Sequence, residues 1–109
     1  MKIIAYDWVR PGVTMETLAP HLDEECANVW RLWKAGIVRE MYSRADEPGV
    51  LIVFELDSVE QARHYTDDFP LTKERLIEWA FLPLTAPAPI EYLFRQEIDV
   101  AEPFDRAAG

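Results

Sequence analysis

Hydrophobic and polar residues alternate most regularly between residues 37 and 56, IVREMYSRADEPGVLIVFEL. A period of two residues is typical of a β-strand, and the Asp-Glu-Pro-Gly sequence in the middle supplies residues that tight turns favour. We therefore predict an antiparallel hairpin with strands near residues 37–44 and 49–56.

The flanking sequence adds two strands and two helices. Residues 2–10 are rich in Ile, Tyr, Trp and Val and stop at Pro-Gly, and residues 76–84 alternate again, so both are predicted strands. Helical spacing of hydrophobic residues predicts helices at 15–35 and 58–68, and Pro20 predicts an irregular start to the first. The order βαββαβ is that of the ferredoxin-like α+β fold, in which two helices cover one face of a four-stranded antiparallel sheet.

Strand alternation assigns side chains to the two faces of this sheet. If Arg44 lies opposite Gly49, the predicted pairs are Tyr42 with Leu51, Glu40 with Val53 and Val38 with Glu55. The helix-covered face should hold Met41, Ile52, Phe54, Ile77, Trp79 and Phe81. The open face should hold Tyr6, Trp8, Val38, Glu40, Tyr42, Leu51, Val53, Glu55, Glu78, Ala80 and Leu82. A face this hydrophobic predicts a homodimer or higher homo-oligomer. In such a dimeric α+β barrel, the sheet of a second chain would enclose a cavity that holds both aromatic and carboxylate groups.

The chain of 109 residues fits one domain, which we place at residues 1–96. After the last strand, a proline-containing segment leads to residues 90–94, which we expect to contact the partner chain. Residues 97–109 have no sustained hydrophobic pattern, so we expect a mobile C-terminal tail there.

Composition excludes several function classes. The net charge is -9 and the eleven Lys and Arg residues form no cluster, so nucleic acid is not an expected partner. No hydrophobic run approaches the roughly 18 residues that span a membrane, and no secretory signal begins the chain, so a cytoplasmic protein is expected. The lone Cys26 falls in the hydrophobic stripe of the first helix, which predicts a buried thiol.

Three segments carry a resemblance to a known family. They are GIVREMYSR at 36–44, DSVE at 57–60, and FPL at 69–71 followed by Ile77-Glu78. Over about residues 31–84 the chain resembles the muconolactone isomerase family of the dimeric α+β barrel proteins. The resemblance implies a barrel-forming dimer that isomerises a small unsaturated lactone acid by moving a proton between carbons, without metal or cofactor. Phe69 stands where the family usually has Leu, and Glu40 stands at the position of the family's strand-two histidine.

Proton transfer of this kind needs a base and a donor for the developing enolate oxygen. The open face offers Glu40, Glu55 and Glu78 as catalytic candidates, with Glu40 the leading one. The predicted substrate-binding residues are Tyr6, Trp8, Tyr42, Arg39 and Arg44, where the tyrosines donate hydrogen bonds and an arginine holds a substrate carboxylate. The other interpretation is that these glutamates only pair with arginines or contact water.

Histidine and metal chemistry have weaker support. His64 shares its helix face with acidic residues and is expected in solvent, while His21 lies beside the hydrophobic stripe. His64 and Asp68 have the i, i+4 spacing of a metal pair, but a third ligand is missing, so we predict no metal and no cofactor. Trp30 and Trp33 are expected to pack in the core or an interface.

Three functions remain after these exclusions, all with a small-molecule ligand. The first is a cofactor-independent isomerase acting on a small lactone or a product of aromatic metabolism. The second is a non-catalytic ligand-binding or accessory protein with the same barrel, and the third is a cofactor-free monooxygenase.

Overall fold

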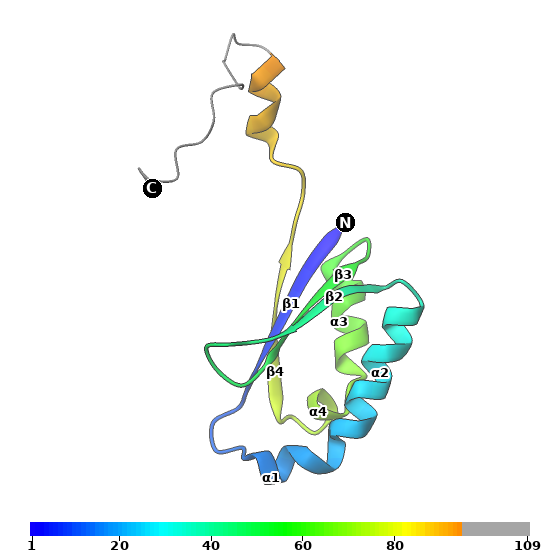
Figure 1. Cartoon of the computed structure of the whole chain (residues 1–109), viewed down its shortest axis with the longest axis vertical. Coiled ribbons are helices and arrows are strands. Elements are labelled where there is room, and N and C mark those ends of the chain that lie inside the picture. Colours follow the sequence, from blue (N-terminus) through cyan, green and yellow to red (C-terminus); the bar gives the residue numbers. More distant parts are fainter. Residues whose placement is uncertain (95–109) are drawn as a thin grey trace.

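The computed structural model describes residues 1–94 and contains the predicted βαββαβ order. The strands form one antiparallel sheet in the order β2-β3-β1-β4. Their bounds are β1 Lys2–Val9, β2 Val38–Ser43, β3 Val50–Glu55 and β4 Ile77–Pro83. The longer helices, α2 (Leu22–Lys34) and α3 (Val59–Asp67), lie side by side on one face of this sheet (Figure 1). The predicted ferredoxin-like α+β fold is therefore confirmed.

The first predicted helix is divided into three parts. α1 (Met15–Leu18) is followed by a 3-10 turn, η1 (Ala19–His21), and only then by α2. Pro20 lies in η1, where its missing N–H leaves no hydrogen bond for a continuous α-helix. α2 has acidic residues in its first turn and basic residues in its last, which suits the helix dipole, and Gly36 follows it with a φ of 77°.

The second helix is fixed at its start and along one side. The Ser58 side chain accepts a hydrogen bond from the Gln61 N–H, which caps α3. Ala62 and Thr66 on the inner side of α3 have no exposed surface, and Phe69 beyond it is 2% exposed. A short helix, α4 (Pro70–Lys73), then leads into β4.

The hairpin register agrees with the prediction near the turn and departs from it at the far end. Glu40 pairs with Val53 and Tyr42 with Leu51, as predicted. Val38, however, pairs with Phe54 and is 1% exposed, so its predicted place on the open face is wrong. A bulge between Val38 and Glu40 inserts one residue, Arg39, and turns Val38 toward the helices.

Two predictions for the first helix, a buried Cys26 and core packing of Trp30 and Trp33, are also wrong, while packing of these tryptophans in an interface stays a prediction. Cys26 is exposed, and Trp30 and Trp33 keep 60% and 43% of their surface exposed. α2 packs on the sheet through a narrow strip around Val29, which is buried, and the positions beside this strip face solvent.

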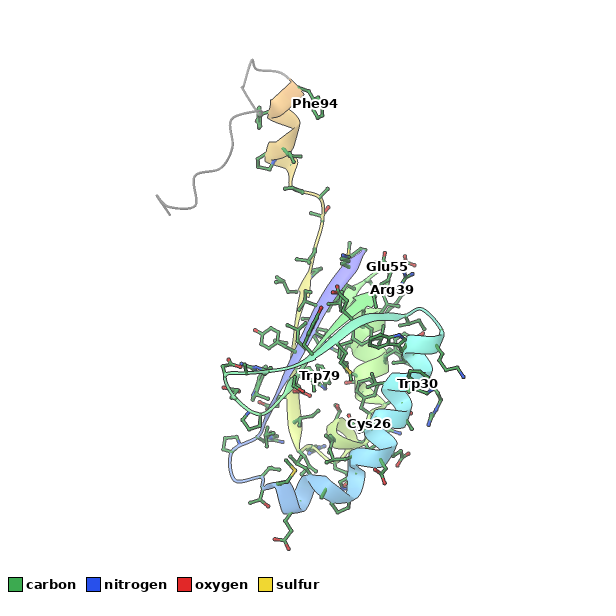
Figure 2. The ribbon with its side chains drawn as sticks, in the orientation of Figure 1. Cys26, Trp30, Arg39, Glu55, Trp79 and Phe94 are labelled. Carbon is green, nitrogen blue, oxygen red and sulfur yellow. The ribbon has the colours of Figure 1, made fainter. Side chains whose placement is uncertain are left out.

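The chain leaves the sheet after β4 and ends its described part in a 3-10 helix, η2 (Ala88–Phe94). Figure 1 shows this segment extending away from the domain, and Figure 2 shows Phe94 at its far end. Phe94 is 90% exposed. The predicted domain end at residue 96 and the predicted tail at 97–109 lie outside the described residues. Within residues 1–94, no helix combines the length and hydrophobicity that crossing a membrane requires.

Candidate functional site

A small cavity lies between the helix-covered face of the sheet and the helices α2 and α4. Its volume is about 140 Å³. All four strands contribute to its lining, which consists of Asp7, Leu22, Glu25, Cys26, Val29, Met41, Val50, Ile52, Phe69, Leu71 and Trp79. Cys26 and Met41 are the exposed members, so the cavity opens between α2 and β2. Most of this lining is hydrophobic, which makes its two carboxyl groups conspicuous.

Asp7 reaches the cavity from β1. It follows Ile3 and Ala5 at every second position of the strand, so it points toward the helices and is 5% exposed. Its Oδ1 accepts a hydrogen bond from the Val50 N–H at 2.7 Å. Burial raises the pKa of Asp7 to about 6, although this hydrogen bond and the charge of Arg44 both act in the opposite direction.

Glu25 faces the same cavity from α2. Its Oε1 accepts a hydrogen bond from the Leu71 N–H in α4 at 3.0 Å. Burial raises the pKa of Glu25 to about 7, against the lowering effect of that hydrogen bond, and the negative charges of Asp7 and Glu24 add to the increase. Both carboxyl groups are therefore anchored by backbone N–H groups and titrate close to neutral pH.

Together these carboxyl groups can carry out acid-base chemistry. The pKa of Asp7 is raised to about 6 and that of Glu25 to about 7, so near neutral pH one carboxyl group of the pair can be ionised while the other is protonated. One group can then accept a proton while the other donates a hydrogen bond or a proton.

Aromatic side chains form one wall of the cavity. The Phe69 and Trp79 ring centroids are 6.0 Å apart with the planes tilted by 59°. The Trp79 indole N–H donates to Thr72 Oγ1 at 2.9 Å, which satisfies the polar end of this ring and fixes its orientation. Trp79 comes from the edge strand β4, and Figure 2 shows Cys26 on α2.

The predicted catalytic glutamates lie on the other face of the sheet. Glu40, Glu55 and Glu78 are all exposed there. Glu40 is on β2 and Glu78 on β4, the two opposite edges, so three interstrand spacings of about 4.8 Å separate their strands. Glu55 pairs with the N-terminal amino group at 3.1 Å. A single chain therefore does not bring these three carboxylates together.

The predicted substrate-binding aromatic residues make hydrogen bonds or ring contacts with other residues of the same chain. Tyr42 donates to Glu40 at 2.8 Å, which raises the pKa of Tyr42. Trp8 donates to Glu78 at 3.1 Å and its ring lies 6.1 Å from that of Tyr6, centroid to centroid.

The two predicted substrate-binding arginines also form hydrogen bonds within the same chain. Arg39 donates to the Gly36 carbonyl at 2.6 Å. Arg44 donates to both carboxylate oxygens of Asp46, at 3.0 and 2.7 Å, and to the Asp7 carbonyl at 2.9 Å. Arg44 therefore ties the hairpin to β1.

The histidines lie apart from the cavity. His64 is exposed on α3, as its polar neighbours predicted. Its ring lies edge-to-face with the ring of Tyr65, with the centroids 5.9 Å apart. His21 is partly buried in η1 and does not line the cavity. In the described part of the chain, no three His, Cys, Asp or Glu side chains are grouped closely enough to hold a metal ion.

Asp7 and Glu25 were not among the residues singled out from the sequence. A signal was present for both. Asp7 occupies an inward position of the first strand, and Glu25 lies three residues after Leu22 and four before Val29, within the hydrophobic stripe of the helix. A carboxylate at a core position marks a functional candidate.

Comparisons with known proteins concern the fold of the chain. No protein family model and no curated protein matches the chain in sequence. In structure, muconolactone isomerase matches with a TM-score of 0.67 and 20% identity, covering 81% of this chain and 92% of that one. The chain has the fold of muconolactone isomerase. The 5-chloro-2-hydroxyhydroquinone dehydrochlorinase of Burkholderia phenoliruptrix, solved with 2,5-dihydroxybenzoquinone, matches with a TM-score of 0.58 and 17% identity, covering 80% of this chain and 96% of that one.

The buried Asp7 carboxylate should make stability depend on pH in a defined direction. Its pKa is raised on folding from 3.8 to about 6, so the folded state binds more protons, and stability is lost as pH rises through this window. We expect Asp7→Asn to stabilise the protein by about 2 to 3 kcal/mol at pH 8, and by much less below about pH 4. Urea unfolding of both proteins across this range measures the difference.

A matched control is Asp23→Asn, which changes an exposed carboxylate on α2. We expect this change to alter stability by less than about 0.5 kcal/mol at every pH. Equal stability of wild type and Asp7→Asn at pH 8 would show that the folded protein does not disfavour the Asp7 charge.

Proposed function

We propose that the chain is a small cofactor-independent enzyme that moves a proton between two atoms of a small unsaturated lactone or an aromatic-derived ring compound. The observation that carries this proposal is the pair of carboxyl groups, Asp7 and Glu25, that face one mostly hydrophobic cavity with pKa values raised to about 6 and about 7. A pKa near the working pH is what general acid-base catalysis requires.

The two carboxyl groups take complementary roles. Ionised Asp7 removes a proton from the carbon next to a carbonyl group, and protonated Glu25 donates a hydrogen bond to the carbonyl oxygen as negative charge develops there. Asp7 then returns the proton to a different carbon of the conjugated system. The substrate is isomerised, and both carboxyl groups recover their starting protonation states.

The comparison proteins support a ring compound as substrate. One is named for the isomerisation of a lactone, and the other was solved with a dihydroxybenzoquinone. Both share the fold of this chain, so the fold itself is compatible with sites for small oxygenated rings. Fold alone does not determine the reaction, and the residues facing the cavity therefore carry the proposal.

Exchange of carbon-bound hydrogen tests the reaction class directly. The protein is mixed in D₂O with unsaturated lactones and hydroxylated aromatic compounds, and NMR follows the loss of the carbon-bound proton signal. Proton transfer without a cofactor predicts deuterium incorporation that depends on the protein. Ligand binding with no exchange would favour the non-catalytic binding protein, and consumption of O₂ with the same compounds would favour the cofactor-free monooxygenase.

We also propose that two copies pack through their open sheet faces. Tyr42 and Leu82 on this face are 56% and 53% exposed, and Tyr6 is 36% exposed. In such a dimer, Glu40, Glu55 and Glu78 would be enclosed between two sheets. The open-face glutamates would then form a second candidate site, with Tyr6, Trp8, Tyr42, Arg39 and Arg44 around it.

Light scattering tests the dimer. We expect at least twice the chain mass of 12.7 kDa at micromolar concentration, and a shift toward one chain mass for Leu82→Arg, because a charge would be buried between the sheets. Trp30→Gln is the control on the other side of the molecule, since Trp30 is exposed to a similar degree, 60% against 53% for Leu82, but lies on α2. If Trp30→Gln dissociates the assembly and Leu82→Arg does not, the helical side forms the interface.

A further inference from the structure

The cavity that holds Asp7 and Glu25 offers no positive charge to a ligand. Among residues 1–94, no Lys, Arg or His side chain lines it. Its ionisable lining groups are the two carboxyl groups and the Cys26 thiol. A ligand carboxylate placed there would lose its hydration shell and meet two acidic groups without a partner.

Arg44, the cation that contacts Asp7, is already paired with other groups. Arg44 donates to both oxygens of Asp46, and its Nη1 also lies 3.4 Å from Glu47 Oε1. Its guanidinium carbon is 5.6 Å from the centroid of the Tyr6 ring, on the open face of the sheet. Only the backbone carbonyl of Asp7 receives a hydrogen bond from it, at 2.9 Å. To pair with an anion in the cavity, Arg44 would have to give up these contacts.

The size of the cavity limits the ligand further. A volume of about 140 Å³ is close to the roughly 150 Å³ of a hydrophobic cavity that holds one benzene ring. Phe69 and Trp79 provide flat surfaces against which such a ring can pack. The polar groups that remain are the two carboxyl groups, which suit hydroxyl and carbonyl substituents.

We propose that the cavity takes an uncharged compound with a single ring that bears hydroxyl or carbonyl groups, and that it rejects the same ring carrying a carboxylate. This inference rests on the proposed function, because it assigns the substrate class of the same site. It departs from the lactone acid that the family resemblance implies, and the reason is the missing cation.

Benzamide and benzoate are a suitable pair of probes, because they have nearly the same shape and differ in charge. We expect NMR titration of the full chain at pH 7.5 to show that benzamide shifts the amide signals of Val50 and Leu71, whose N–H groups hold the two carboxylates. Benzoate should bind at least about 100-fold more weakly, because like charges would be brought together.

Two variants test the cause of this selectivity. Glu25→Gln removes one of the two negative charges and should reduce the difference between the probes by about 10-fold. Asp23→Asn removes an exposed charge on α2 that neither lines the cavity nor raises the pKa of Glu25, so the difference should stay unchanged.

The outcomes separate this inference from the proposed function. If benzoate binds as tightly as benzamide, or if neither moves these amide signals, the inference is wrong. If the protein exchanges hydrogen on a lactone acid faster than on its neutral methyl ester, the inference is also wrong while the proton-transfer function stands. If benzamide alone binds and no compound is exchanged, the substrate class stands and the proposed catalysis is wrong.

Discussion

Glu25→Gln should lower turnover by about 100-fold or more, the usual effect of losing a hydrogen-bond donor to the developing oxyanion. Gln has nearly the shape of Glu, and its carbonyl oxygen can still accept the Leu71 N–H bond that Glu25 accepts at 3.0 Å. What its amide group cannot match is the strong hydrogen bond that a carboxylic acid with a pKa near 7 donates to an oxygen on which negative charge develops. Hydrogen exchange in D₂O, measured on any compound that the wild type exchanges, gives the ratio.

The pH profile of turnover provides a second test of the same assignment. Wild-type activity should rise as Asp7 ionises near pH 6 and fall as Glu25 loses its proton near pH 7, giving a narrow maximum. In Glu25→Gln the descending limb should disappear, because the group that caused it is gone. Loss of a merely structural contact would lower activity without removing a limb.

Two further variants locate the site. Asp23→Asn alters an exposed residue on α2, two positions before Glu25, and should keep turnover within about twofold of the wild type. Glu40→Gln tests the open face. If it abolishes turnover while Glu25→Gln leaves it intact, the chemistry takes place between two sheets and the cavity beneath the helices is not the active site.

The sequence predicted the fold well because its elements are strongly patterned. Alternation predicts the hairpin strands, helical spacing predicts the two helices, and the Pro-Gly and Phe-Pro sequences mark where elements end. The observed bounds differ from the predicted ones by a few residues. Val38 was misplaced because a single-residue bulge reverses the face of every residue on one side of it. A bulge at Arg39 leaves no local signature in an otherwise regular alternation.

The candidate site was harder to predict for a different physical reason. Strand alternation put Glu40, Glu55 and Glu78 on the open face, and they are there, but alternation says nothing about which strands are neighbours. The order β2-β3-β1-β4 places two of them at opposite edges. Asp7 and Glu25 come together only through the packing of α2 on the sheet. Each was visible in the sequence as a carboxylate in a hydrophobic stripe, whereas the dimer expected from the hydrophobic open face placed the predicted cavity, and with it the candidate glutamates, on the other face.

Gly49→Ala should reduce both stability and turnover, because a methyl group at this position would collide with Asp7. An added Cβ would lie 2.5 Å from the Asp7 carbonyl oxygen and 2.7 Å from its Oδ1, and the φ of Gly49, 156°, is rarely adopted by other residues. We expect the free energy of unfolding to fall by about 3 kcal/mol, the upper range for overpacking a close contact. Urea unfolding measures this loss.

The same substitution should also show that Gly49 positions the Asp7 carboxylate. Pushing β3 away would lengthen the bond from the Val50 N–H, which holds the pKa of Asp7 down, so the rising limb of the pH profile should move to higher pH. Gly12→Ala is the control. Its φ is 84° and nothing lies within 4 Å of an added Cβ, so it should cost only about 1 kcal/mol and leave the profile unchanged.

A double-mutant cycle separates collision with Asp7 from strain in the hairpin itself. In the Asp7→Ala background the clash with Oδ1 is absent, while the contacts with the carbonyl oxygen of residue 7 and with Arg44 Cδ, 3.1 Å from the added Cβ, remain, so Gly49→Ala should cost less than in the wild type. Equal losses in both backgrounds would mean that the hairpin, and not the carboxylate, requires glycine at position 49. A smaller loss of unfolding free energy in the Asp7→Ala background, together with the shifted pH profile, would show that the hairpin turn at Gly49 positions the Asp7 carboxylate for acid-base chemistry beneath the helices.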